Sequence, residues 1–315
     1  MVEKQVLVVI LNWNNWEETI SCITSVLESS FKNCHVVLVD NNSTDDSVEQ
    51  IKNKFPNLDI LINSANLGYA GGNNTGLKKY LHSDYDFAFI VNNDCILHID
   101  CIRKLVDYYE SLSEVDKIGF LGPLVFSSSI NDKTANVQFS GSYWSESSVS
   151  YKFSKDILQD NTPIECPVVL GCSLFCSFEL LREIGIFDER FFLLWEETDI
   201  CLRAITKGYK NFCIPDAMIF HIGGSSFKKL STKREAFWNY FYRRNQLLWI
   251  EKHFTTSEKM SYYKTLLLQE SISALKTFLS LRSEEKSRLM ASARLQAYLD
   301  YITRQFGDCP SWLRD

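Results

Sequence analysis

Three short apolar runs in the first third of the chain, each followed by an amphipathic segment, constrain the fold more than any other feature. The runs cover residues 6–11, 35–39 and 58–62. Continuous apolar runs of this length are typical of strands buried on both faces of a parallel sheet. Strands that alternate with helices predict right-handed βαβ units. The sequence therefore predicts an α/β fold with a mostly parallel, Rossmann-like sheet flanked by helices.

A fourth apolar run stops abruptly at Asn92, Asn93 and Asp94. Open parallel sheets bind ligands beyond the carboxyl ends of their strands, so Asp94 is expected where its charge can reach a cation or a phosphate. A simple turn is the alternative, because Asn and Asp are common turn residues. Two other apolar runs also end in polar residues, at Asp40 and at His221, and this repetition favours a ligand-binding site over a simple turn.

The remaining patterns divide the chain into an N-terminal part, residues 1–230, and a C-terminal helical region, residues 231–315, with the boundary expected within 227–232. An exposed antiparallel ribbon is expected over residues 137–153 and a last strand over 212–221. The expected helices include those over residues 16–28, 99–112, 178–184, 235–253, 257–281 and 283–305.

Residues 66–76 form a glycine-rich segment expected to be a loop that leads into a helix ending near residue 81. Such a loop can offer backbone N–H groups to phosphates, but glycines also permit tight packing. The glycine spacing matches neither the dinucleotide fingerprint nor the P-loop. A dinucleotide oxidoreductase is therefore disfavoured.

The net charge, the apolar runs and the cysteine content argue against several classes of protein. The net charge of −6 argues against a general nucleic-acid binder. No apolar run approaches the roughly 20 residues that span a bilayer, so we expect a cytoplasmic protein, with peripheral contact at the inner face of the cell membrane left open. The ten cysteines are scattered without zinc-ligand spacing. They are expected to be reduced core thiols rather than a zinc site.

The order and surroundings of these polar clusters resemble the family-2 glycosyltransferases of GT-A fold, and most closely the rhamnosyltransferase-like branch that builds bacterial surface polysaccharides. The resemblance covers residues 6–254, and it implies that residues 1–230 are the catalytic domain, with a nucleotide-binding half over about 1–125 and an acceptor half over about 126–230. It implies metal-dependent, inverting transfer of a sugar, with rhamnose as a guess, from a nucleotide-diphosphate donor to a hydroxyl of a growing cell-surface polysaccharide or lipid-linked glycan. A protein or lipid acceptor stays open. A catalytically silent nucleotide-sugar or glycan-binding protein also stays open, because Asn92 replaces the first acid of the family's Asp-x-Asp motif.

The resemblance also implies the donor-binding residues. The aromatic-Asn pair after the first strand holds the base, Asp40 lies near the base or ribose, and the glycine-rich segment lies beneath the nucleotide. Asn73 stands where many relatives carry Arg, which puts that phosphate contact in doubt. The donor-binding residues expected on this basis are Asn12, Trp13, Asn14, Asp40, Asn66, Gly68, Asn73, Asn74, Asn92 and Asn93, with Gly76 in the same loop.

Asp94 matches the last acid of the Asp-x-Asp motif, which binds Mg²⁺ or Mn²⁺ in relatives, and His221 matches a late His that serves as a further ligand. Such a cation neutralises the charge on the leaving diphosphate. One carboxylate plus phosphates can hold Mg²⁺, so the loss of the first acid need not abolish binding. A lone histidine is more often structural.

Glu197 matches the general base of inverting relatives within their Glu-Asp-x-Asp motif, with Glu196 as the second candidate. Residues 191–195 are expected to approach Glu197 as an apolar strand. The alternative is a structural role for the two glutamates, because acidic side chains at the start of a helix interact favourably with the helix dipole. Asp199, the other expected acceptor-side acid, would then pair with Arg203.

Trp195 is expected either to stack on an acceptor sugar or to lie in the core. The aromatic segment around Tyr240, with Arg244 and Asn245, resembles the family's Tyr-Tyr-x-x-Arg-Asn motif. A helix of this kind can lie on a membrane, but packing within the protein or against a second subunit is favoured.

Overall fold

The computed structural model describes residues 4–113, 116–127, 136–156, 160–223, 233–279 and 285–314. The chain forms two compact units: Met1–Asp188 with Glu196–Ser226, and Glu189–Trp195 with Phe227–Asp315. The expected boundary within 227–232 lies outside the described residues, and the division at 230/231 stays a prediction. No pattern in the sequence predicts that residues 189–195 group with the C-terminal helices.

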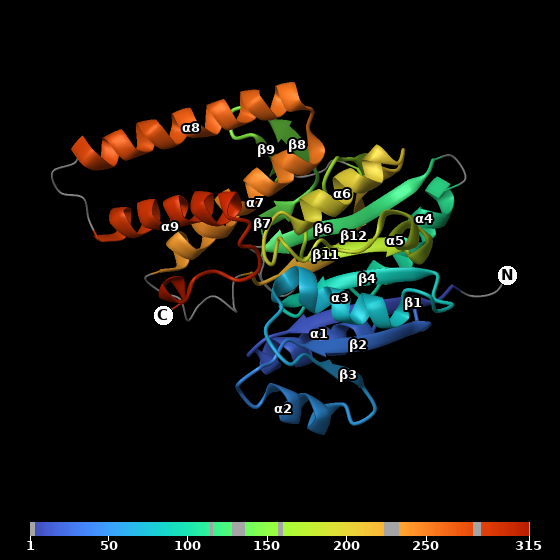
Figure 1. Cartoon of the computed structure of the whole chain (residues 1–315). Coiled ribbons are helices and arrows are strands. Elements are labelled where there is room, and N and C mark those ends of the chain that lie inside the picture. The colour runs from blue at the N-terminus through green and yellow to red at the C-terminus, as the bar shows by residue number, and fades with distance from the viewer. Residues whose placement is uncertain are drawn as a thin grey trace. The chain divides into compact units, whose positions relative to one another are not determined.

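Ten strands of the described part form one sheet, in which eight follow the order β10-β12-β6-β11-β4-β1-β2-β3 (Figure 1). β1, β2, β3 and β4 are parallel neighbours, as are β6 and β12, whereas β11 runs antiparallel between β4 and β6. The expected mostly parallel sheet is confirmed. The strands of this path are β1 (Val6–Asn12), β2 (Cys34–Asp40), β3 (Asp59–Ile62), β4 (Phe87–Asn92), β6 (Ile118–Ser127), β10 (Ile164–Glu165), β11 (Ser173–Ser177) and β12 (Lys210–His221).

Two further strands extend this sheet, β5 (Cys95–Leu97) beside β12 and β7 (Asn136–Phe139) beside β6. β8 (Ser142–Ser145) and β9 (Ser150–Phe153) form a separate antiparallel ribbon, as expected from the alternating sequence there. β1 and β4 are buried almost throughout, because each lies inside the sheet with both faces covered.

Six helices lie in the described residues of the first unit, and their bounds lie close to those expected where the sequence signal was clear. The glycine-rich segment differs, because it is helical from Gly68 onward and the expected loop is wrong. A Cβ on Gly76 would lie 2.9 Å from Val9 Cγ1, so the glycines let this helix approach β1 closely. The six are α1 (Trp16–Leu27), α2 (Ser47–Lys54), α3 (Gly68–Tyr80), α4 (Cys101–Ser113), α5 (Phe178–Ile184) and α6 (Glu196–Thr206).

The second unit contains α7 (Arg234–His253), α8 (Thr256–Leu279), α9 (Glu285–Ile302) and the short 3₁₀ helix η2 (Ser311–Leu313). The aromatic side chains of α7 are mostly buried, including Phe237, Tyr240, Phe241 and Trp249. This burial supports packing over membrane contact for that helix. No helix in the described part of the chain has the length and apolarity needed to cross a bilayer.

Candidate active site

The carboxyl ends of β1, β2 and β4 meet at one edge of the sheet. Asn12 lies beside Asp40, and its Nδ2 donates to Asp40 Oδ1 at 2.8 Å. Thr19 Oγ1 donates to Asn12 Oδ1 at 2.7 Å and accepts from Asn93 Nδ2 at 2.8 Å. All four side chains are buried. The Asn93 amide thus belongs to an interior network that fixes this edge, and its expected contact with the donor stays a prediction.

The turns beyond these strands are held by their own side chains. Asn14 has φ 55° and accepts from the Thr44 N–H at 2.7 Å, while Asp40 also accepts from the Ser43 N–H at 2.9 Å. Trp13 is half-buried beside them. Asn92 is half-buried at the end of β4, and its N–H donates to the Cys172 carbonyl.

The start of α3 carries the other expected donor residues. Asn66 Oδ1 accepts from the Gly68 N–H at 2.8 Å, which pins the first turn of the helix. Asn74 Nδ2 donates to the Phe187 carbonyl at 2.9 Å, and Asn74 Oδ1 accepts from the Phe187 N–H at 3.1 Å. Asn73 is fully buried, and within the described residues its Oδ1 has no hydrogen-bond partner. Asn73 and Asn74 are thus interior residues, and their expected contacts with the donor stay predictions.

Asp94 and His221 meet as the resemblance implied. β5 pairs with β12 so that Cys95 lies opposite His221, which brings the preceding Asp94 beside that ring. Asp94 Oδ1 lies 3.2 Å from His221 Nε2, and His221 Nδ1 lies 3.0 Å from Gln138 Oε1. Two ligand atoms at right angles, each about 2.1 Å from one cation, stand about 3.0 Å apart. The pair therefore fits as two ligands of one divalent cation.

Two thiols lie next to this pair. The ligand atoms of Cys95, Cys172 and His221 all lie within 4.8 Å of one another. Burial disfavours the charged forms of Cys172 and His221, but their contacts with neighbouring side chains together have a larger effect on both pKa values. Cys172 and Asp94 raise the pKa of His221 to about 11, whereas hydrogen bonding from Cys95 and the charge of His221 lower the pKa of Cys172 to about 5. Cys95, Cys172 and His221 meet although the sequence shows no zinc-ligand spacing.

The two acids that open α6 occupy different environments. Glu196 is 4 % exposed, and burial together with the charge of Glu197 raises its pKa well above the ordinary value. Glu197 is half-buried and lies against Gly171, where an added Cβ would come within 3.3 Å of Glu197 Cβ. The Tyr69 hydroxyl donates to the Gly171 carbonyl, and both acids raise the pKa of Tyr69 beyond the effect of its burial. Sequence reasoning missed Tyr69.

The consecutive residues Gly171 and Cys172 lie next to Glu197 and to the Asp94–His221 pair, respectively. Gly171 contacts Glu197, and Cys172 lies beside His221 and Cys95. Consecutive Cα atoms are about 3.8 Å apart, so the carboxylate of α6 and the Asp94–His221 pair lie next to adjacent residues. The acid and the Asp94–His221 pair thus share one neighbourhood.

The two residues expected to contact the acceptor lie in the interior, and their contacts with it stay predictions. Asp199 is fully buried and accepts from Arg203 Nε at 3.0 Å, which is the structural alternative. Trp195 is 5 % exposed in the second unit, with its ring 4.9 Å from that of Trp249, so it is a core residue. Residues 191–195 are not a strand, because Phe192 and Leu194, like Trp195, have positive φ.

Arg244 and Asn245 of α7 stabilise the backbone conformation of residues 191–195. Positive φ costs a bulky residue roughly 1–3 kcal/mol. Asn245 Nδ2 donates to the carbonyls of Phe191, Leu193 and Leu194 at 2.6, 2.7 and 2.9 Å. Arg244 Nη2 also donates to Phe191, at 3.2 Å. The motif therefore holds the segment that leads directly into α6.

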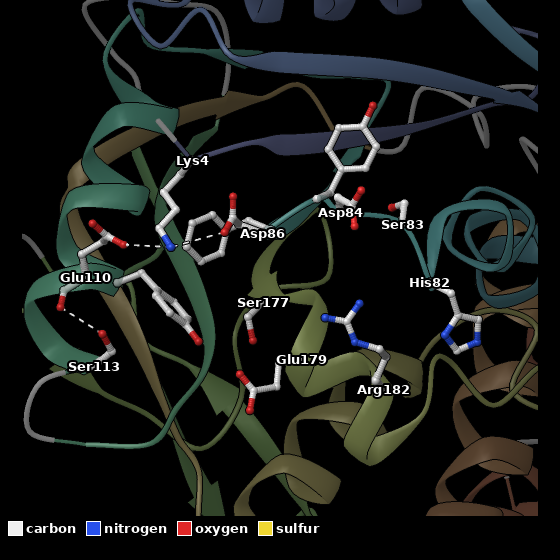
Figure 2. A pocket seen from close by; sticks show the side chains of 13 residues that line it. Lys4, His82, Ser83, Asp84, Asp86, Glu110, Ser113, Ser177, Glu179 and Arg182 are labelled. Atoms are coloured by element: carbon white, nitrogen blue, oxygen red, sulfur yellow. Dashed lines mark hydrogen bonds and ion pairs between the residues drawn. The ribbon is translucent and has the colours of Figure 1, made fainter. Parts of the chain in front are cut away.

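A separate pocket of about 580 Å³ lies at the opposite edge of the sheet, where β1 and β4 begin (Figure 2). Its Lys4 is engaged by Asp86 and Glu110 at 3.3 and 3.6 Å. Open α/β sheets bind ligands at the carboxyl ends of strands, so the Asp94 edge is the better candidate site.

Known proteins resemble this chain over much of its length. Residues 7–185, more than half of the chain, match the family model of glycosyl transferase family 2. The chain is 23 % identical over 236 residues to dTDP-rhamnosyl transferase RfbF of Shigella flexneri, covering 72 % of each protein. It is 26 % identical over 212 residues to N-acetylglucosaminyl-diphospho-decaprenol L-rhamnosyltransferase of Mycobacterium tuberculosis, covering 59 % of this chain and 66 % of that protein.

Solved structures confirm the GT-A type of fold. A crystal structure of GalNAc-T7 with UDP, GalNAc and Mn²⁺ has a TM-score of 0.58 at 18 % identity and covers 84 % of this chain and 55 % of the other. A crystal structure of S. aureus TarS 1–349 has a TM-score of 0.53 at 16 % identity, covering 95 % and 81 %. With the family match, these findings establish that the chain belongs to glycosyl transferase family 2 and is a nucleotide-sugar glycosyltransferase.

Proposed function

We propose that the chain is a metal-dependent, inverting glycosyltransferase that moves rhamnose from a nucleotide-diphosphate donor to a hydroxyl of a growing cell-surface glycan. The supporting observation is the dipeptide Gly171-Cys172, which has Glu197 against one residue and the Asp94–His221 pair beside the other. An inverting displacement needs a base and a stabilised leaving group in one site.

Glu197 is the proposed base. It takes the proton of the acceptor hydroxyl as that oxygen attacks the anomeric carbon on the side opposite the leaving diphosphate. Glu196 is unsuited to this role, because burial and the neighbouring charge favour its protonated form. The protonated neighbour also reduces charge repulsion at Glu197.

Asp94 and His221 are the proposed ligands of Mg²⁺ or Mn²⁺. A divalent cation bound there would offset the negative charge that the diphosphate acquires as it leaves. Trp13 and Asn14, at the ends of the strands nearby, remain the proposed contacts to the base, and Asp40 and Asn12 hold that edge in place.

The names of two relatives guide the choice of substrates. One is a dTDP-rhamnosyl transferase and the other acts on N-acetylglucosaminyl-diphospho-decaprenol. Thymidine-diphosphate rhamnose is therefore the first donor to test, and a lipid-linked glycan is the first acceptor. A lipid-linked acceptor would place the reaction at the inner face of the cell membrane, which is where peripheral contact would matter.

The test is turnover of thymidine-, uridine- and guanosine-diphosphate sugars with Mn²⁺, with and without a lipid-linked glucosaminyl acceptor, followed by assignment of the anomeric configuration of the product. We expect transfer with inversion that stops when EDTA removes the cation. Retained configuration, or full activity in EDTA, would contradict the proposal. Donor binding without any turnover would favour the silent binding protein.

A further inference from the structure

The two thiols beside the proposed cation site come from distant parts of the sequence. Cys95 lies opposite His221 in the β5–β12 pairing, and Cys172 immediately precedes β11. Cys95 Sγ also donates to the Cys172 carbonyl at 3.7 Å. Among the described residues, these three side chains form the one group of His, Cys, Asp and Glu ligands whose atoms all lie within 4.8 Å.

The donor set is that of a soft cation. Two sulfurs and an imidazole suit zinc-class metals, whereas Mg²⁺ and Ca²⁺ take oxygen ligands. In a tetrahedral zinc site, Zn–S bonds of about 2.3 Å and Zn–N bonds of about 2.1 Å put neighbouring ligand atoms about 3.6–3.8 Å apart. The observed limit of 4.8 Å is about 1 Å longer, a difference that rotamer adjustment at the cysteines can close.

The histidine is shared between two metal chemistries. His221 Nε2 lies 3.2 Å from Asp94 Oδ1 on one side and belongs to the thiol cluster on the other. One ring nitrogen cannot bind two cations at once. A cation held by the thiols would therefore take His221 from a cation held at Asp94.

We propose that Cys95, Cys172 and His221 bind a soft divalent cation of the zinc class, with Asp94 or water as the fourth ligand, and that this binding inhibits sugar transfer by competing for His221. The inhibitory consequence rests on the proposed function, whereas the binding itself does not. Binding releases the protons of the ligand groups to solvent, and no oxidation is involved.

Cobalt spectroscopy of the full chain tests the site directly. Co²⁺ added to the reduced protein should give a thiolate-to-metal charge-transfer band that saturates at one equivalent and disappears when Zn²⁺ is added. Cys172→Ser and Cys95→Ser should each weaken Co²⁺ binding at least about 100-fold, because loss of a ligand costs more than loss of an outer-shell partner. Cys176→Ser is the matched control, since Cys176 is equally buried in β11 but outside the cluster. It should bind Co²⁺ as the parent does.

X-ray absorption at the zinc edge keeps the test valid if the cysteine variants fail to fold. The Zn²⁺-loaded parent protein should show sulfur at about 2.3 Å. A zinc shell of oxygen and nitrogen alone, or a charge-transfer band that survives in both cysteine variants, would overturn the proposal.

A turnover assay then separates this proposal from the proposed function. Zn²⁺ should inhibit transfer competitively with Mn²⁺, and the ratio of activity with and without Zn²⁺ should approach one in Cys172→Ser. Inhibition that is unchanged in that variant would overturn the competitive role. If the protein has no transferase activity, the sulfur shell would still be present, so the two failures are distinguishable.

Discussion

Replacing Asn245 by Ala removes the amide that holds residues 191–194, two of which have positive φ. Three carbonyls accept from that amide, but Phe191 keeps Arg244 as a donor. The carbonyls of Leu193 and Leu194 therefore lose their side-chain donor. Each unsatisfied buried group costs about 1–3 kcal/mol, and these half-buried ones lie in the lower part of that range. We expect a loss of about 2–3 kcal/mol in the free energy of unfolding.

Asn239→Ala is the matched control, because it makes the same substitution on the same helix. Asn239 donates only to the Glu235 carbonyl one turn earlier, in an exposed bond, so its loss should stay within about 0.5 kcal/mol. Urea unfolding followed by circular dichroism gives the free energies. Hydrogen exchange with mass spectrometry should show faster exchange at residues 189–195 in Asn245→Ala alone. Parent-like exchange and midpoint in that variant, or equal damage from Asn239→Ala, would refute the reasoning.

Three further outcomes follow from the contacts. Asp94→Asn should abolish Mn²⁺-dependent binding of the donor in calorimetry, while His221→Ala weakens it less; undiminished binding in Asp94→Asn would remove Asp94 from the metal site. Gly76→Ala should lower stability in thermal denaturation by about 1–3 kcal/mol, because its Cβ would come within 2.9 Å of a β1 valine; an unchanged melting temperature would mean that α3 shifts freely. Hydrogen bonds from Arg304 lower the pKa of Glu251 to about 2 from about 4.5, so this pair should stabilise the fold above pH 4.5 and lose that contribution as pH falls toward 2, and Glu251→Gln should flatten this part of a pH–stability curve.

The local elements could be predicted from the sequence because buried parallel strands and amphipathic helices leave a local pattern. α5 was expected over residues 178–184 and spans Phe178–Ile184, and β12 ends at His221 as expected. The pattern failed where glycines decide the structure. Residues 66–76 have the composition of a loop, but the glycines serve close helix–strand approach.

Strand order and the contents of the site depend on contacts between distant segments, which a single sequence does not encode locally. β11 pairs antiparallel between β4 and β6, and this pairing carries Gly171 and Cys172 to the site. Cys95, Cys172 and His221 therefore meet without any zinc-like spacing in the sequence. The Asp94–His221 contact was foreseen only through the resemblance, since neither residue predicts the other by pattern.

The positions matched to relatives include amides and acids that are internal in the structure. Asn74 and Asp199 are two of them, and each forms hydrogen bonds with neighbouring residues. Burial of this kind cannot be read from residue type, because the same Asn or Asp serves equally well in a turn, a cap or a ligand contact.

The central claim is that Glu197 is the base, and paired Gln variants of the two acids test it most directly. A general base contributes about 10²–10⁴-fold, so Glu197→Gln should lower kcat by that factor while donor affinity stays nearly unchanged. Glu196→Gln should retain most activity, because Glu196 is already favoured in its neutral form. If Glu196→Gln is the inactive variant, the base has been assigned one residue too late; if both turn over normally, no base resides at the start of α6 and the account fails.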